Sequence, residues 1–109
     1  MAKFLVLYRA PASAQEQMSK ATPEQAKAGM EAWMAWAGRA GSAIADMGSP
    51  TQLSAYLGAG KAVGDPIGGY SIVQADSLAA ARKVLDGHPH LSMPGAAIEV
   101  LEFLALPGM

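Results

Sequence analysis

Two neighbouring histidines are the residues of this sequence best suited to acid–base chemistry. His88 and His90 stand in residues 86–90 (DGHPH), directly after a stretch that predicts a helix. Histidine titrates near neutral pH and is also a common metal ligand. Either His88 works in a pocket, or it caps the end of the helix, where a partly positive imidazole suits the helix dipole. In the second interpretation His90 is a loop residue.

The His-x-His spacing can place two imidazoles on one metal ion, but a stable site needs a third or fourth ligand. Asp46 or Glu99 would have to supply that ligand from a predicted strand. Thiolate sites and disulfides are excluded because the sequence contains no cysteine. We therefore predict no resident metal and no cofactor, and we assign His88 and Asp46 to a catalytic acid–base role.

Further polar side chains interrupt segments that otherwise predict strands. A carboxylate in a strand, such as Asp46, must be paired, hydrated or functional. Tyr70 follows two glycines, which would let a ligand or another backbone come close. Glu99 and Glu102 are three residues apart, which puts them on opposite faces of a strand unless a bulge intervenes. The alternative for Asp46 is an exposed turn carboxylate, and the alternative for Tyr70 is a core or interface aromatic ring. For Glu99 and Glu102 the alternative is a pair of edge-strand charges that discourage aggregation. The residues that we assign to substrate contacts are His90, Tyr70, Ser49 and Glu99.

Hydrophobic periodicity and capping signals predict the elements that would position these residues. Thr22, Pro23 and Gln25 have the pattern of a capping box at the start of a helix. Its apolar stripe is predicted to consist of Ala26, Met30, Trp33, Ala37 and Ala40. The predicted helices are residues 23–40 and 78–86, and the polar stretch 11–20 is predicted as a loop. The predicted strands are residues 4–8, 42–47, 69–75 and 98–104, with a weaker one at 51–57.

This order of elements is the split βαβ, ferredoxin-like arrangement of the α+β class, βαββαβ, in one domain of residues 1–109. Two helices would cover one face of an antiparallel sheet. The strand 4–8 is apolar on both faces, but few residues are left to cover the second face. We therefore expect a homodimer in which two sheets meet face to face.

Composition and charge narrow the range of partners. Hydrophobic residues make up 51% of the chain and charged residues 16%, against a usual charged fraction of about 25%. Surplus apolar surface favours self-association. The net charge of −1 and the scattered basic residues predict no nucleic acid and no membrane as partners. The sequence contains no apolar run with the length of a signal peptide or a membrane span, so we expect a soluble, cytoplasmic protein.

Six short motifs follow one another along the chain: residues 3–8 (KFLVLY), 46–50 (DMGSP), 68–73 (GGYSIV), 77–81 (SLAAA), 88–89 (HP) and 98–100 (IEV). In this order they resemble the motifs of YCII-related proteins, which include relatives named for an Asp-Gly-Pro-Phe signature. The resemblance covers nearly the whole chain. It implies a dimeric α+β barrel with a cleft between sheet and helices or along the dimer interface.

The same family resemblance also implies which residues would form an active centre. A His–Asp pair is the suggested active centre in some members of this family, and its aspartate resembles Asp46. The histidine of that pair lies near the start of the first helix, where residues 24–30 contain none in this chain. Residues 65–67 (DPI) also lack the glycine and phenylalanine of the signature.

Two functions remain open. One is a small-molecule-binding protein or acid–base enzyme whose pocket holds a small apolar, aromatic or lactone-like ligand, with His88 and Asp46 in the acid–base step. The other is a non-catalytic dimeric accessory or interaction protein, because the dyad histidine is missing and the sequence contains no complete catalytic set. The family resemblance adds a transcription-associated role, since some relatives occur beside or fused to transcription-associated domains. Fold analogy alone adds a cofactor-free or haem-handling monooxygenase, which would place a histidine on the pocket wall.

Overall fold

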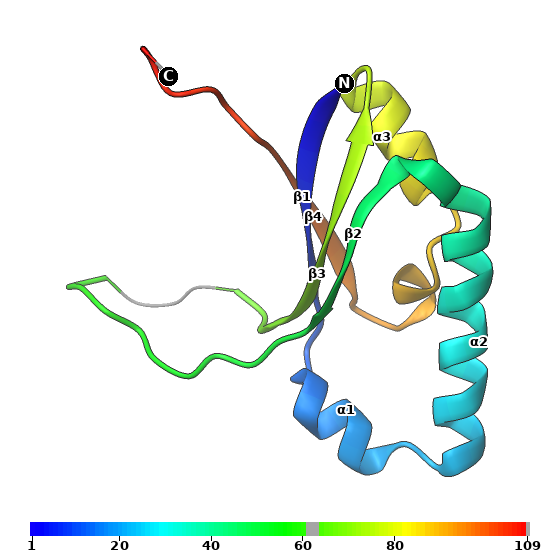
Figure 1. Cartoon of the computed structure of the whole chain (residues 1–109). Coiled ribbons are helices and arrows are strands. Elements are labelled where there is room, and N and C mark those ends of the chain that lie inside the picture. The colour runs from blue at the N-terminus through cyan, green and yellow to red at the C-terminus, as the bar shows by residue number, and fades with distance from the viewer. Residues whose placement is uncertain (61–63, 109) are drawn as a thin grey trace.

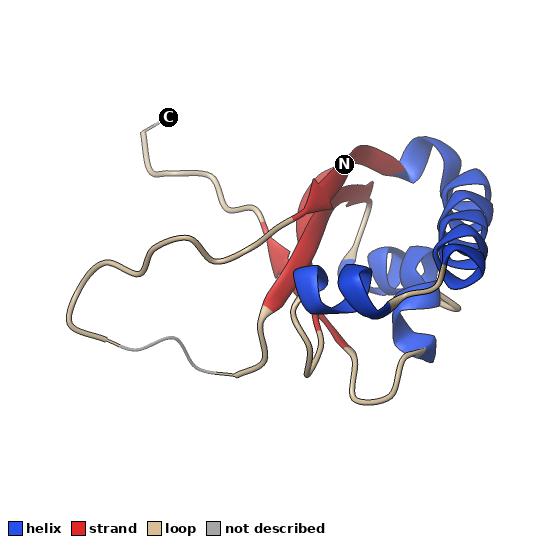
Figure 2. Cartoon of the chain, turned by 90° about the horizontal axis from the view of Figure 1, so that it is seen from below, coloured by secondary structure: helices blue, strands red, loops and turns tan. Residues whose placement is uncertain are grey.

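The structure is a computed structural model that describes residues 1–60 and 64–108, and it has the α+β ferredoxin-like fold predicted from the sequence. Four antiparallel strands form one sheet in the order β2-β3-β1-β4. The strands are β1 (Ala2–Arg9), β2 (Ile44–Pro50), β3 (Ile67–Ala75) and β4 (Ala97–Glu102). The helices α1 (Ala14–Lys20), α2 (Pro23–Ala40) and α3 (Leu78–Leu85) lie on one side of this sheet (Figures 1 and 2).

The core fills the space between the sheet and the helices. Alternate residues of β1, namely Phe4, Val6 and Tyr8, are buried on the side of the helices, as the two-residue period of a strand requires. Val73 of β3 and Trp36 of α2 pack into the same cluster. The buried face of the sheet is therefore set by the even-numbered positions of β1.

Helix α2 begins with the predicted capping box. The Thr22 N–H donates to the Gln25 side chain at 2.9 Å, and the Gln25 N–H donates to the Thr22 hydroxyl at 3.1 Å. The predicted apolar stripe was wrong in part, because Trp36 is the buried residue of the helix and Met30 is 64% exposed. Only the second half of α2 packs on the sheet. Met30 lies in the first half, so it has the helical spacing of the apolar stripe but no core residue to pack against.

Two predicted segments differ in the structure. Residues 11–20 were predicted as a loop, but Ser13 accepts from the Glu16 N–H and caps α1. Residues 51–57 were predicted as a weak strand, but they form none, because the chain leaves the sheet after Pro50. Short 3-10 turns, η1 (Gly41–Ala43) and η2 (Pro89–Ser92), complete the described elements.

The second face of the sheet, which we call the open face, is not covered by any described helix (Figure 2). Its apolar side chains include Leu5, Leu7, Ile72 and Leu101, which are half-buried or exposed. Residues 51–60 and 103–108 extend away from the body on this side (Figures 1 and 2). The predicted lack of a cover for this face within the chain is confirmed for the described residues.

Candidate functional site

His88 lies at the centre of a cluster of aromatic rings, which we call the His88 cage. Its ring centroid is 5.0 Å from that of Tyr8, 4.5 Å from Trp33 and 4.3 Å from Trp36. His88 is 2% exposed, and Tyr8 and Trp36 are also buried. Trp33 is half-buried, so this indole is the wall of the cage that meets the surface. The cage joins β1, α2 and the segment after α3.

The hydrogen bonds of His88 define which ring nitrogen carries the proton. The backbone N–H of His90 donates to Nδ1 of His88 at 3.0 Å, so Nδ1 holds a lone pair. In a neutral imidazole the proton is then on Nε2. This Nε2 is buried and has no hydrogen-bond partner among the described residues. The cage therefore contains a buried N–H donor to which the described part of the chain offers no acceptor.

Burial, together with the smaller effects of the nearby His90 and Arg39, lowers the pKa of His88 to about 4. A histidine with this pKa is neutral at pH 7. The imidazole is therefore a hydrogen-bond donor through Nε2. It is a poor proton acceptor, because Nδ1 is already bonded and the charged form is disfavoured.

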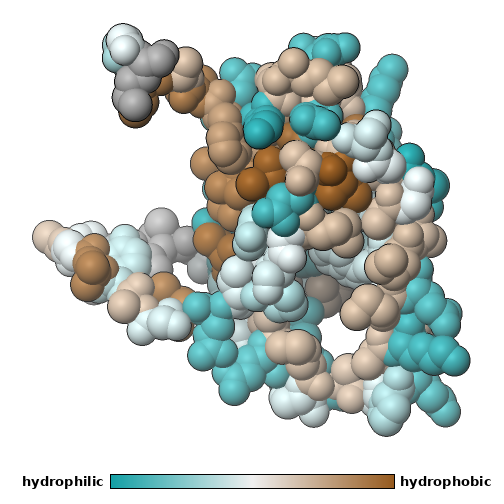
Figure 3. Space-filling view, viewed as in Figure 1, coloured by the Kyte–Doolittle hydropathy of each residue, from teal (hydrophilic) through white to brown (hydrophobic). Residues whose placement is uncertain are grey.

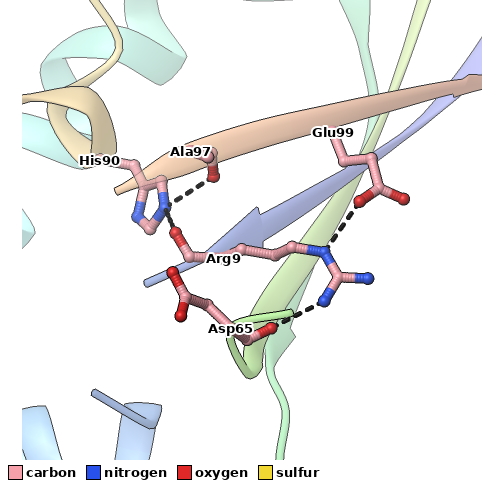
Figure 4. Close-up of polar contacts among 5 residues, drawn as sticks. All are labelled: Arg9, Asp65, His90, Ala97 and Glu99. Atoms are coloured by element: carbon pink, nitrogen blue, oxygen red, sulfur yellow. Dashed lines mark hydrogen bonds and ion pairs between the residues drawn. The ribbon is translucent and has the colours of Figure 1, made fainter. Parts of the chain in front are cut away.

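His90 connects the end of β1 to the start of β4. Its Nε2 lies 2.8 Å from the carbonyl oxygen of Arg9 and 3.1 Å from that of Ala97 (Figure 4). Two carbonyl acceptors require a proton on this nitrogen. His90 is buried, and its described contacts are those of a residue that holds two strand ends together.

Tyr8 and Ser71 form a buried polar chain beside the cage. The Tyr8 hydroxyl donates to the Ser71 hydroxyl at 2.8 Å, and Ser71 donates to the carbonyl oxygen of Met47 at 2.8 Å. Burial raises the pKa of Tyr8, and the hydrogen bond with Ser71 opposes this effect. The phenol stays protonated and its orientation is determined by Ser71.

The other predicted site residues lie on the open face. Ser49 pairs with Tyr70, Tyr70 with Leu7, and Leu7 with Glu99, so these four residues form one row across the sheet. Directly opposed residues share a face. Asp46 lies in the next row, opposite Ile72.

The two carboxylates in these rows, those of Glu99 and Asp46, both have partners. Glu99 is in an ion pair, and Asp46 accepts a hydrogen bond within a turn. Nε of Arg9 donates to Glu99 at 2.8 Å, and Nη1 of Arg9 donates to the carbonyl oxygen of Asp65 at 2.7 Å (Figure 4). Asp46 is exposed, and its carboxylate accepts from the Gly48 N–H at 2.8 Å in a bulge of β2. The interpretation of Asp46 as an exposed turn carboxylate fits this position.

The sheet separates the two groups of predicted residues. His88 packs on Tyr8, which faces the helices, whereas Asp46 lies opposite Ile72 on the open face. His88 and Asp46 therefore form no hydrogen bond with each other in the described chain, and they line different surfaces. The structure does place Ser49, Tyr70 and Glu99 in one row of the open face, with Leu7 between Tyr70 and Glu99. It places Glu102 opposite Phe4, on the other face from Glu99 as predicted.

Sequence reasoning missed the partners of His88. Trp33 and Trp36 stand three residues apart on α2, a spacing that puts both rings near one helix face. Ser71 occupies a buried position between two buried strand positions, Gly69 and Val73. A hydroxyl at a core position of a strand is a signal for a buried hydrogen bond.

Neither of two shallow surface grooves is lined by the residues of the His88 cage. A groove of about 270 Å³ lies between α3 and β4, and one of about 340 Å³ lies between α1 and the end of β2.

Among the described residues, no three His, Asp or Glu side chains gather closely enough to hold a metal ion. No helix in the described chain has the length and apolar character needed to cross a membrane.

Comparison with known proteins gives a distant likeness in fold. No protein-family model matches the chain, and no curated protein matches its sequence. A similar solved structure is the 5-chloro-2-hydroxyhydroquinone dehydrochlorinase of Burkholderia phenoliruptrix in complex with 2,5-dihydroxybenzoquinone. The two share 21% identity over 89% of this chain and 90% of that chain, with a TM-score of 0.48. A likeness this distant says nothing about the reaction or the ligand of this chain.

Proposed function

We propose that this chain binds a small aromatic or lactone-like molecule with a carbonyl oxygen, and that His88 donates its Nε2–H to that oxygen. The observation that carries this proposal is the buried Nε2–H of His88, which lacks an acceptor among the described residues. A buried donor without an acceptor costs about 1–3 kcal/mol. A ligand oxygen at this nitrogen would remove that cost.

The surroundings of the donor suit an aromatic ligand. Tyr8, Trp33 and Trp36 already stack on or abut the imidazole within 5.0 Å between ring centroids. Flat rings pack well against such side chains, and ligand sites typically combine apolar walls with a few placed polar groups. Trp33 is the half-buried wall, so rotation of its side chain is the simplest way for a ligand to reach Nε2.

The protonation state of His88 defines the chemistry that the cage can support. With its pKa lowered to about 4, His88 is a neutral donor at pH 7. A neutral imidazole N–H can polarise a carbonyl group and stabilise negative charge that develops on its oxygen. The acid–base role predicted for His88 is thus replaced in this proposal by electrophilic hydrogen bonding. Asp46 has no part in this step, because it lies beyond the sheet.

Two further expectations belong to the same proposal. The chain is a member of the YCII-related family by its motif order, and it works as a homodimer. The polar row of Ser49, Tyr70 and Glu99 then faces the dimer interface as a contact surface, and the ligand binds on the other side of the sheet, at His88.

Coumarin, an aromatic lactone, and naphthalene, a ring pair without a carbonyl group, test the proposal directly. Calorimetric titration of the wild-type protein should give at least ~10-fold tighter binding of coumarin, equivalent to about 1.4 kcal/mol. In His88→Phe, which fills the cage but has no N–H, this preference should disappear. Equal preference in the wild type and the variant, or no binding of coumarin at all, would contradict the proposal.

A further inference from the structure

We infer that the free edge of β4 is a docking site for an extended, basic segment of another protein, which adds to the sheet as a further strand. β4 is an edge strand in the order β2-β3-β1-β4, and its register with β1 is regular over Ala97–Glu102. An edge strand presents backbone N–H and C=O groups with which another strand can pair. The edge of β4 lies outside the His88 cage, so this inference is separate from the ligand proposal.

The hydrogen-bond pattern of β4 determines which of its backbone groups point outward. The Phe103 N–H donates to the carbonyl oxygen of Lys3 at 3.0 Å, one residue beyond Glu102 in the register. Hydrogen-bonded and non-hydrogen-bonded pairs alternate along an antiparallel ladder. Glu102, Val100 and Ile98 are therefore in non-hydrogen-bonded pairs, and their N–H and C=O groups point away from β1.

A groove beside this edge can receive side chains of the added strand. Directly opposed residues share a face, so the residues opposite Ile98 and Val100 would project to the side of the helices. The groove of about 270 Å³ lies there, and its apolar lining consists of Ile98, Val100, Leu85 and Leu91. Leu91 is 50% exposed. A docking segment should therefore have apolar side chains at two alternate positions.

The apolar surface at this edge continues past the end of the strand. Phe103 is 50% exposed and Leu104 is 80% exposed. Figure 3 shows apolar surface where residues 103–108 leave the body. A segment longer than β4 can therefore keep apolar contacts beyond Glu102.

The other edge of the sheet is protected against such pairing. β2 has register shifts between Ile44 and Asp46 and between Asp46 and Ser49, and it ends in Pro50. Bulges and proline are devices by which natural sheets prevent the addition of a strand. β4 has a regular register and contains no proline. Of the two edges, β4 is therefore the one that can accept a partner strand.

Charge determines the kind of segment that fits. β4 contains two carboxylates, Glu99 and Glu102, and no cation. Glu99 is paired with Arg9, whereas Glu102 is exposed and has no ion pair in the described part of the chain. Opposite charges directly across a ladder stabilise pairing, so a lysine or arginine opposite Glu102 is favoured. A second copy of β4 would bring further carboxylates and no cation.

A short synthetic peptide tests the inference on the full-length chain. The fluorescein-labelled probe has the sequence Lys-Thr-Val-Lys-Val-Thr. In an antiparallel pairing its valines lie opposite Val100 and Ile98, and its first lysine lies opposite Glu102. Fluorescence anisotropy should show saturable binding.

N-methylated versions of the probe separate backbone pairing from side-chain contact. N-methylation of both valines removes N–H groups that would donate to β4, and it should weaken binding at least ~10-fold. N-methylation of the first threonine and the second lysine is the control, because these N–H groups would point away from β4. The control peptide should bind within ~2-fold of the probe.

Variants of the protein test the same pairing from the other side. Val100→Pro removes an N–H that points away from β1, so the ladder with β1 can persist. This variant should bind the probe at least ~10-fold more weakly, with unchanged circular dichroism. Glu102→Lys, which leaves the backbone intact, should bind it at least ~3-fold more weakly. The control is Leu78→Ser, 53% exposed on α3 and outside the groove, which should bind as the wild type does.

Three results would overturn the inference. The first is the absence of saturable binding at millimolar probe. The second is equal binding of the two N-methylated peptides, because side chains alone would then hold the probe. The third is a lower mass of Val100→Pro than of the wild type by light scattering, because a second copy would then occupy this edge. Coumarin binding should be the same in Glu102→Lys and in the wild type, so the ligand proposal and this inference can fail separately.

Discussion

At His88 the buried neutral ring should make the stability of the fold depend on pH. Its folded pKa of about 4 lies below the usual value of about 6.5 in an unfolded chain. Between these values the unfolded chain binds more protons, so the free energy of unfolding falls as the pH falls. The contribution of His88 is complete above pH ~6.5, and about 2–3 kcal/mol of it is lost by pH ~4.5.

Urea unfolding at neutral pH and near pH ~4.5 checks this prediction. The difference between wild type and His88→Phe isolates the titration of this one ring, because all other titratable groups are the same in both. The variant should lose less stability than the wild type on acidification. Parallel losses in the two proteins would show that His88 titrates normally in the fold.

The Tyr8–Ser71 chain predicts an asymmetry between two small substitutions. Ser71→Ala removes the acceptor of the Tyr8 hydroxyl and the donor to the Met47 carbonyl, which should cost about 1–3 kcal/mol. Tyr8→Phe leaves Ser71 bonded to Met47, so it should cost about 1 kcal/mol. Chemical denaturation measures both, and a larger loss in Tyr8→Phe would contradict the hydrogen-bond order described.

At the scale of residues, the sequence predicted which side chains were unusual for their positions. It could not predict which of these side chains lie in contact with one another. His88 stood out by type, and the odd spacing of Glu99 and Glu102 correctly predicted opposite faces. The separation of His88 from Asp46 depends on the face that β1 turns to the helices and on a bulge in β2. Both of these follow from tertiary packing, which spacing along one chain does not encode.

At the scale of elements, the bulge of β2 makes a sharp prediction for Gly48. Its φ is +76°, and a Cβ at this position would lie 1.7 Å from the carbonyl oxygen of Tyr70. Gly48→Ala should therefore destabilise the fold by more than about 2 kcal/mol, since the backbone of β2 or β3 must shift.

Gly29→Ala is the matched control for this substitution. Gly29 lies within α2, and a Cβ there would meet nothing within 4 Å. Alanine should stabilise the helix by about 0.5–1 kcal/mol. Thermal unfolding of the two variants should therefore move in opposite directions, and a neutral Gly48→Ala would mean that the bulge relaxes easily.

Some helices and strands could be predicted from local sequence signals alone, and others could not. The capping box of α2 is encoded in adjacent residues, and it was predicted from them. Helix α1 has a cap at Ser13 but no buried residue, so hydrophobic periodicity gave no signal for it. Residues 51–57 have strand-like residues, but the structure gives them no neighbouring strand, and a strand without a partner does not form.

At the scale of the whole molecule, the order of the elements was enough to predict a ferredoxin-like sheet with helices on one face. The amount of apolar sequence predicted that this chain has more to bury than one core can hold. The direction that residues 51–60 and 103–108 take away from the body was not predictable, because it depends on where the strands end in space. The same limit applies to the His88 cage, which assembles three segments that are far apart in the sequence.

The most direct test of the central claim is the nitrogen-15 spectrum of the histidine side chains at neutral pH. The chain has two histidines, so a His90 variant assigns both rings. We predict a neutral His88 with a slowly exchanging Nε2–H, which moves downfield when coumarin is added and stays in place with naphthalene. An Nε2–H that does not move at saturating coumarin, or a protonated ring at neutral pH, would contradict the claim that His88 is the donor to a ligand.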